Sequence, residues 1–165
     1  MSSKGYNLAA SFLFAIRGVF FALGHERNLR IHFAAAALAF WCARYFGLTR
    51  AEWTVLIATV GLVIVCELVN TAIETAVDLF SPTYSRLAKA AKDVAAGAVL
   101  VSAGTSVAIG WLLLGKADGW LRILAVLRKW PVVFVALAAV IAFWIILPGN
   151  RRPSQRNNPT RRKDT

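Results

Sequence analysis

Long apolar stretches, separated by short polar ones, run through most of the chain. One of the longest, residues 53–80, contains no proline and would form about 42 Å of helix, which exceeds the roughly 30 Å hydrocarbon core of a bilayer. Residues 31–48, 86–114 and 131–147 are also long and apolar enough to predict membrane spans. The pattern therefore predicts four spanning helices, and part of the second one must project into the head groups.

The first apolar segment, residues 8–24, differs from the others because Arg17 stands at its centre. An arginine at the middle of a spanning helix costs about 2.5 to 3.5 kcal/mol on insertion scales. We therefore expect this segment to lie in the membrane interface as a surface helix. The alternative is that it crosses the bilayer.

The pattern as a whole predicts an all-α integral membrane protein with a three-span core. Ser85 follows a turn of polar and turn-forming residues and is expected to cap the next helix. We expect five regions along the chain: an interfacial amphipathic helix and charged turn (1–30), the three-span core (31–115), a linker with an amphipathic stretch (116–129), an additional transmembrane helix (130–148) and a basic disordered tail (149–165).

Composition supports membrane insertion and excludes other classes. Hydrophobic residues make up 58% of the chain and its mean hydropathy is +0.60, more than a soluble domain of this size needs for its core. Cys42 and Cys66 both lie in apolar segments, where we assign them no chemistry. The start of the chain lacks the features of a cleavable signal peptide, so we expect the first span to direct insertion.

The net charge of +11 is spread over the ends and loops of the apolar segments, which argues against nucleic-acid binding. With four spans and an interfacial first helix, thirteen of the 19 basic residues fall on the side that holds the N-terminus, the 81–92 loop and the tail. The positive-inside rule then places that side in the cytoplasm. We expect a multi-pass protein of the bacterial inner membrane.

The segment 53–80 carries acidic residues in its second half. Glu67, Asn70, Glu74 and Asp78 fall within about 80° of one another on a helix. Measured from Trp53, they lie about 21 to 37 Å along the helix axis, so the stripe runs from inside the bilayer to its far surface. Acids at membrane depth are functional by default. The alternatives are a structural role in holding helices together and a non-enzymatic proton or cation pathway.

Further charged residues predict phosphate chemistry beside this stripe. Glu26 lies at the membrane surface next to a histidine, and Lys89, Lys92 and Asp93 lie at the start of the helix predicted for 86–114. Mg²⁺ usually takes one or two protein carboxylates and fills its other positions with water and phosphate. A helix N-terminus with basic side chains favours a polyphosphate. Residues 110–116 approach a P-loop pattern, but an alanine replaces the hydroxyl residue that would hold Mg²⁺.

The sequences ELVNTAIETAVD (67–78) and RLAKAAKDVAAGAVLV (86–101) resemble the bacterial diacylglycerol kinase and undecaprenol kinase family of small membrane lipid kinases. The resemblance covers residues 12–114 and includes GHERNLRIH (24–32). It implies a homotrimer of three-span subunits that transfers the γ-phosphate of ATP to a membrane lipid alcohol with Mg²⁺ as cofactor. The extra C-terminal span and the tail fall outside this pattern, and Phe14 stands where some members carry a polar aromatic.

The resemblance also implies roles for individual residues. Glu67 matches the general base, and Glu26 and Glu74 match Mg²⁺ ligands that also contact the nucleotide. The remaining matches are nucleotide contacts at Tyr84, Ser85, Lys92 and Asp93, and substrate contacts at Arg30, Glu67 and Asn70. By resemblance the chain is closer to the undecaprenol kinase branch, and diacylglycerol is the alternative substrate.

Overall fold

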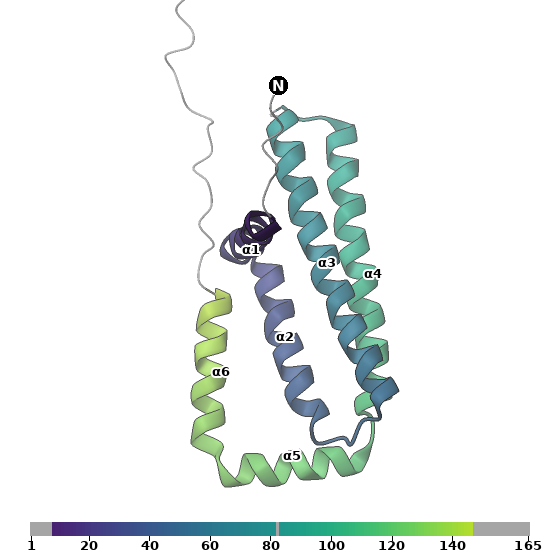
Figure 1. Cartoon of the computed structure of the whole chain (residues 1–165), viewed down its shortest axis with the longest axis vertical. Helices are drawn as coiled ribbons and strands as arrows, with labels where there is room; N and C mark the ends of the chain where they lie inside the picture. Colours follow the sequence, from purple (N-terminus) through teal and green to yellow (C-terminus); the bar gives the residue numbers. More distant parts are fainter. Residues whose placement is uncertain (1–7, 82, 147–165) are drawn as a thin grey trace, which may run out of the picture.

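This computed structural model describes residues 8–81 and 83–146, which form helices joined by short turns and contain no strand (Figure 1). These residues form α1 (Leu8–His25), α2 (Arg27–Ala43), α3 (Arg50–Phe80), α4 (Arg86–Leu114), α5 (Ala117–Lys129) and α6 (Pro131–Ile146). By length and composition, α1, α3 and α4 qualify as helices that can cross a membrane. The prediction of an all-α integral membrane protein is confirmed.

Helices α3 and α4 form a long antiparallel hairpin that is the frame of the molecule (Figure 1). The buried residues of α3 recur every three or four positions, as one face of a helix requires. They are Leu56, Thr59, Val63, Glu67, Asn70 and Thr71. The predicted polar stripe is therefore the continuation of the apolar packing face of α3. Ser85 caps α4 as predicted, with its hydroxyl accepting from the Ala88 amide at 3.4 Å.

Helix α3 begins earlier than the hydrophobic pattern predicted, at Arg50 rather than Trp53. A capping box sets its start: the Thr49 hydroxyl accepts from the Glu52 amide, and the Glu52 carboxylate accepts from the Thr49 amide at 2.7 Å. Two of the amides that a helix N-terminus leaves unpaired are thereby satisfied.

Helix α2 also differs from the predicted span at 31–48, since it covers Arg27–Ala43. It starts four residues earlier because arginine and leucine favour helix and only Glu26, with extended backbone angles, separates it from α1. It ends earlier because the chain turns at Gly47, whose φ of +61° is a conformation that glycine adopts readily. The helix is about 25 Å long, somewhat less than a hydrocarbon core.

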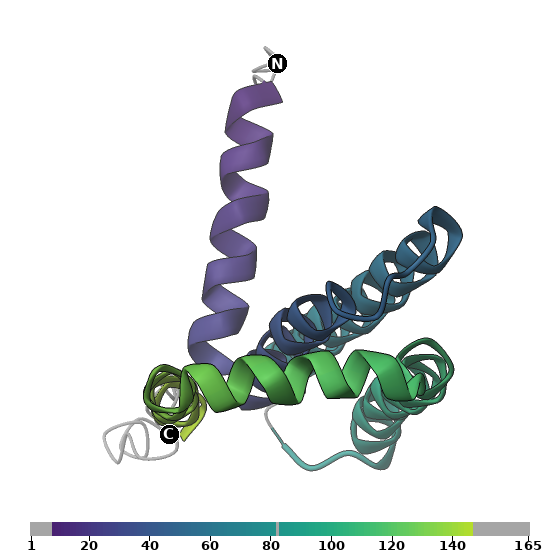
Figure 2. The same cartoon turned by 90° about the horizontal axis from the view of Figure 1, so that it is seen from below.

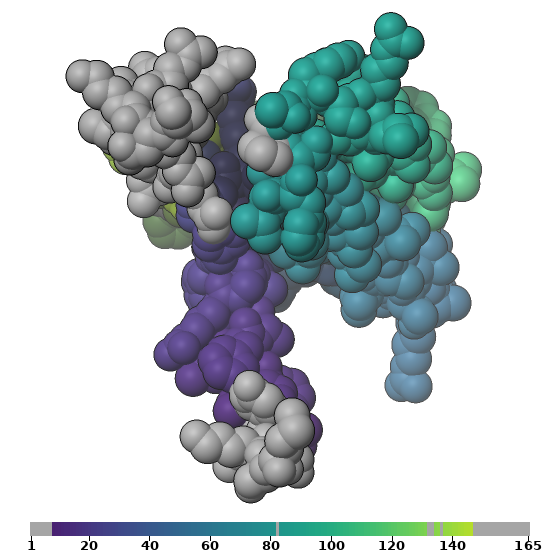
Figure 3. Space-filling view, turned by 90° about the horizontal axis from the view of Figure 1, so that it is seen from above, coloured from purple at the N-terminus to yellow at the C-terminus, as the bar shows by residue number. Residues whose placement is uncertain are grey.

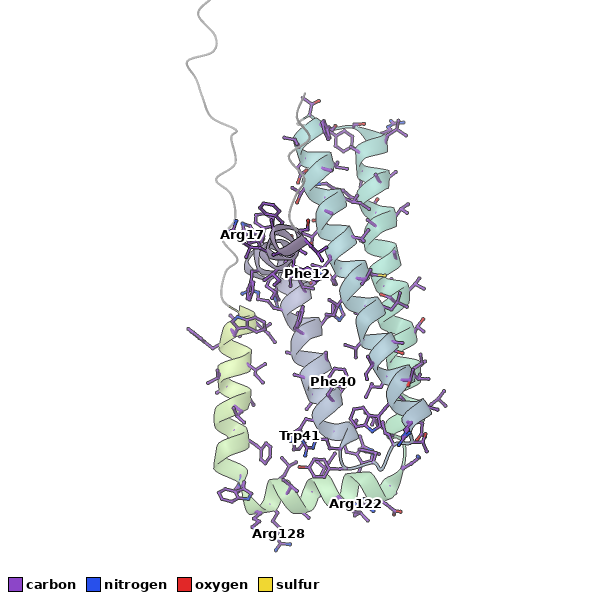
Figure 4. All side chains as sticks on the ribbon, in the orientation of Figure 1. Phe12, Arg17, Phe40, Trp41, Arg122 and Arg128 are labelled. Carbon is purple, nitrogen blue, oxygen red and sulfur yellow. The ribbon has the colours of Figure 1, made fainter. Side chains whose placement is uncertain are left out.

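Helix α1 lies across the axis of the α3–α4 hairpin and not along it (Figure 2). In the space-filling view it projects as an arm from the rest of the molecule (Figure 3). Most of its large apolar side chains are exposed, including Phe12 at 64% and Phe20 at 68%, and Arg17 points to a different side from Phe12 (Figure 4). This crosswise direction is the one that an interfacial helix requires. Placement in the interface remains a prediction, because α1 is also long enough to span.

Helices α5 and α6 form the C-terminal extension. Helix α5 crosses the bundle at the end opposite to α1 (Figure 1), with Ile123 buried against Cys42 and Phe46 and Arg128 pointing away from the bundle (Figure 4). Helix α6 then returns beside α2, where the rings of Trp41 and Phe134 meet edge to face at 5.3 Å between centroids. The predicted tail 149–165 lies outside the described residues.

The two crosswise helices mark two levels in the molecule. Helix α1 joins the start of α2, α5 packs below its end, and α3 and α4 continue past the level of α1 (Figure 1). The distance between the level of α1 and the level of α5 is roughly the length of α2, about 25 Å, which is close to the thickness of a hydrocarbon core. The ends of α3 and α4 that hold Asp78 and Lys92 therefore project beyond the slab that α1 and α5 bracket.

Topology gives the first prediction. Four spans with α1 in the interface put the C-terminal tail in the cytoplasm, so a cysteine introduced at Ser154 should resist a membrane-impermeant thiol reagent in intact cells and react after permeabilisation. The background should carry Cys42→Ala and Cys66→Ala, since both native cysteines are free. Ready labelling in intact cells would refute the four-span arrangement.

The α5 contact gives the second prediction. A Cβ added to Gly119 would lie 2.4 Å from a ring carbon of Phe46, so Gly119→Ala should displace that ring and lower the stability by about 1 to 3 kcal/mol. Thermal unfolding in detergent micelles measures the change. Gly104→Ala is the matched control, because nothing lies within 4 Å of the Cβ it would add. Equal melting temperatures for the two variants would contradict this docking of α5.

Candidate active site

Glu67 is the centre of the site and is only 1% exposed. It lies on the packing face of α3, one helical turn beyond Val63, and the Thr71 hydroxyl donates to its backbone carbonyl at 3.0 Å. The side chain is buried on the packing face of a helix that can cross the membrane, where a carboxylate is costly. Its Oε1 has no hydrogen-bond partner among the described residues, and such an atom calls for a functional explanation.

His32 faces this carboxylate from α2, with its Nε2 3.2 Å from Glu67 Oε1. The two atoms are at ion-pair distance, but their alignment is not that of a hydrogen bond. The sequence analysis did not single out His32. A signal was present, because it is an isolated polar residue between Ile31 and Phe33 in an apolar segment.

Glu26 and Glu74 lie close enough to Glu67 to repel its charge, so the three carboxylates predicted for the site are brought together. They come from the α1–α2 junction and from two turns of α3. Burial and the neighbouring Glu74 carboxylate raise the pKa of Glu26, and His25 opposes them. Like charges held this close are expected where a cation binds.

Asn70 completes this cluster, since its amide donates to Glu74 Oε1 at 2.9 Å. Its own carbonyl oxygen, Oδ1, is buried without a partner in the described structure. The described residues contain no group of three or more His, Cys, Asp or Glu side chains that could hold a metal ion. Two carboxylates suit Mg²⁺, which fills its other positions with water and phosphate, better than they suit a metal that needs a complete protein cage.

The start of α4 lies beside the outer end of the stripe. Lys92 pairs with Asp78, one helical turn beyond Glu74 on α3. Asp93 pairs instead with Lys89 on its own helix, and Tyr84 is 81% exposed. The structure thus joins Lys92 to the acid stripe, whereas Asp93 and Tyr84 do not contact it.

Arg30 is buried, at 5% exposure, but it does not pair with the carboxylates. Its Nη1 donates to the backbone carbonyl of Trp144 in α6 at 2.9 Å. Its Nε has no partner among the described residues. The sequence contained no pattern that linked these two positions.

An apolar cavity of about 120 Å³ adjoins the buried end of the site. It lies between α2, α3 and α4 and extends from His32 past Ala36 and Val63 to Leu56 and Leu114. The cluster can therefore be approached from an apolar side at one end, between the levels of α1 and α5. At the other end, where Asp78 and Lys92 lie, the approach is charged.

The sequence model of prokaryotic diacylglycerol kinase matches residues 13–114, which is more than half of the chain. The chain belongs to this family. An undecaprenol kinase of Bacillus subtilis is 44% identical over 103 residues, covering 62% of this chain and 84% of that protein. A diacylglycerol kinase of Synechocystis is 43% identical over 109 residues, or 66% of this chain and 62% of that protein. No solved structure matches the chain.

Membership confirms the prediction of a lipid kinase. The match runs from α1 to the end of α4, so it includes the three carboxylates, Asn70 and Lys92. Helices α5 and α6 lie outside it. A further relative, a diacylglycerol kinase of Helicobacter pylori, is 42% identical over 67 residues, covering 39% of this chain and 52% of that protein.

Repulsion within the cluster gives the third prediction. Glu74→Gln should lower the pKa of Glu26, because a like charge is removed, but should leave it above the usual value, because burial is the larger cause. Carboxyl shifts of ¹³C-labelled glutamate, followed by NMR during a titration in Mg²⁺-free buffer, measure this. The control is Asp118→Asn in α5, at the other end of the molecule. If Glu74→Gln leaves the titration of Glu26 unchanged, the two carboxylates do not face each other.

Proposed function

We propose that the protein transfers the γ-phosphate of Mg-ATP to the hydroxyl of a membrane lipid alcohol, with undecaprenol as the substrate. The observation that carries the proposal is the buried Glu67 carboxylate, with one oxygen unpartnered, between an apolar cavity and a cluster of charged residues. A lipid hydroxyl approaches from the apolar side, and a water-soluble nucleotide approaches from the charged side.

Glu67 acts as the general base in this proposal. A carboxylate in an apolar seam accepts a proton more readily than one in water, because desolvation disfavours its charge. The Glu67 carboxylate accepts the proton of the lipid hydroxyl, and the oxygen of the hydroxyl attacks the γ-phosphorus. The bond between that phosphorus and the β–γ bridging oxygen breaks, and ADP leaves. His32 holds the carboxylate from the opposite helix. Phosphoryl transfer asks mainly for such positioning and for charge compensation.

Glu26 and Glu74 are the proposed Mg²⁺ ligands, supported by the proximity that makes them repel each other. Asn70 orients Glu74 through its amide and has a free carbonyl oxygen for the substrate or for metal-bound water. Mg²⁺, when bound, supplies charge neutralisation for the phosphates. Lys92 of α4, which pairs with Asp78 one turn beyond Glu74, offers a cation to the nucleotide. Tyr84, Ser85 and Asp93 are proposed to contact the nucleotide from the same end.

The choice of undecaprenol rests on the identity to an undecaprenol kinase, together with the quoted motifs. Diacylglycerol is the second candidate, because a diacylglycerol kinase is nearly as similar. Purified protein in vesicles, given radiolabelled ATP and a panel of lipid alcohols, separates the two through the mobility of the labelled lipid.

The proposed assembly is a homotrimer in the inner membrane, with the ATP side facing the cytoplasm. Support for this orientation comes from the excess of basic residues on that side. The crosswise α1 would lie on the same surface, beside the carboxylates that bind the metal.

The fourth prediction concerns Glu67. Glu67→Gln keeps the shape of the side chain but removes the base, so turnover should fall by about 10² or more while Mg-ATP still binds. Turnover is measured by transfer of ³²P to lipid, and nucleotide binding by equilibrium dialysis. Glu52→Gln is the control, since that glutamate caps the far end of the same helix. Turnover like that of wild type in Glu67→Gln would overturn the assignment of the base.

A further inference from the structure

Arg30 joins the family core to the C-terminal extension. It lies in α2, in the part of the chain that the family model matches, and donates from Nη1 to the carbonyl of Trp144 in α6, which lies outside that part. The guanidinium is buried. This hydrogen bond therefore links a residue of the matched region to a helix outside it.

The acceptor of this bond, the backbone carbonyl of Trp144, is available because of its place in α6 and of the sequence that follows. The carbonyls of the last helical turn have no amide partner within their helix, and Trp144 lies in the last turn of α6. The residue four positions further on, whose amide would pair with it in a longer helix, is Pro148, and proline has no N–H. The negative end of the helix dipole also favours a cation there.

Packing alone does not explain why α6 lies along α2. None of the α6 side chains described is buried, and Val135, Val140 and Phe143 are 65% to 69% exposed. In a bilayer, apolar surface gives helices little reason to associate, because lipid tails cover it equally well. Described contacts hold α6 at two points: the Trp41–Phe134 ring pair near its start and Arg30 near its end.

A second donor of the Arg30 guanidinium, Nε, lacks an acceptor within the described structure. Arg30 Nε is buried and has no partner among the described residues, and a buried donor of this kind is costly unless a ligand satisfies it. Arg30 lies one helical turn from Glu26, since its amide bonds to the Glu26 carbonyl at 3.4 Å. The free donor is thus close to the carboxylate cluster.

We propose that α6 is a positioning helix for Arg30: a carbonyl near its C-terminal end holds the guanidinium, and the Nε donates to the hydroxyl oxygen of the lipid alcohol. This inference rests on the proposed lipid kinase reaction and adds a role for the extension, which fixes a lipid-binding side chain of the core. Arginine suits such a role because its donors are held in a rigid plane, so fixing one N–H fixes the direction of the others.

The test uses full-length variants of α6 in the vesicle assay. Phe134→Ala loosens α6 from α2, and Ala142→Pro disrupts its last turn. Both should raise KM for the lipid alcohol about tenfold, with kcat and KM for Mg-ATP within about twofold of wild type. Arg30→Lys should reproduce the effect, because lysine has no second donor at a fixed angle.

A double-mutant cycle with Arg30→Ala distinguishes positioning from general packing. If α6 acts through Arg30, Phe134→Ala should have no further effect on lipid KM once Arg30 is replaced. Full additivity of the two changes, or unchanged lipid KM in the α6 variants, would overturn the inference. Arg122→Gln is the matched control, because it removes the other guanidinium–carbonyl contact of the extension, to Tyr45 at 3.4 Å, and should leave lipid KM unchanged.

Glu67→Gln in the same assay keeps the two proposals apart. If Glu67→Gln is inactive while the α6 variants have normal lipid KM, the role of α6 is wrong and the proposed reaction stands. If Glu67→Gln retains full turnover, the proposed reaction loses its base whatever the α6 variants show.

Discussion

A carboxylate buried in a seam between two membrane helices is the constraint on which this structure depends. Glu67 occupies a position in the packing face of α3 that an apolar residue would otherwise take. Leu56 and Val63 take such positions earlier in the same helix. The protein satisfies it only in part, through the contact with His32. Stability alone would favour a leucine at this position, so the unpaired oxygen indicates a site that is completed by a bound molecule.

The proposed reaction requires this carboxylate to be reached from two phases, and the arrangement of the other helices suits that requirement. A lipid alcohol and a nucleotide do not share a solvent, so their reacting groups must meet at a boundary. Helices α3 and α4 extend past the level of α1 (Figure 1), and the face that carries Glu67 continues outward to Asp78 and its partner Lys92. One helical stripe thereby connects the apolar cavity to the aqueous side.

Much of the fold was predictable because it is encoded locally. The bounds of α4 and its Ser85 cap were predicted residue for residue, and the stripe of α3 followed from helical periodicity. The starts of α2 and α3 were predicted wrongly because hydrophobicity was used to place them. The Thr49 and Glu52 spacing of a capping box was readable and fixes the start of α3 correctly.

Contacts between distant elements were not predictable in this way. Nothing local links Arg30 to Trp144, which lie 114 positions apart, or brings His32 to Glu67. Periodicity states which residues share a face, but not which face of another helix they meet. The sequence assigned the three carboxylates to one site only through the family resemblance, which supplied what a single helix pattern lacks.

The joint between α1 and α2 has a consequence for how the site senses its surroundings. Glu74 is held by the interior of the protein, through α3 and Asn70. Glu26 lies at a one-residue break next to α1, whose apolar side chains are mostly exposed and which is predicted to lie in the membrane interface. The position of Glu74 is therefore set by contacts within the protein, whereas that of Glu26 would also depend on where α1 lies. With α1 in the interface, as the sequence predicts, the distance between Glu26 and Glu74 would depend on the thickness of the bilayer.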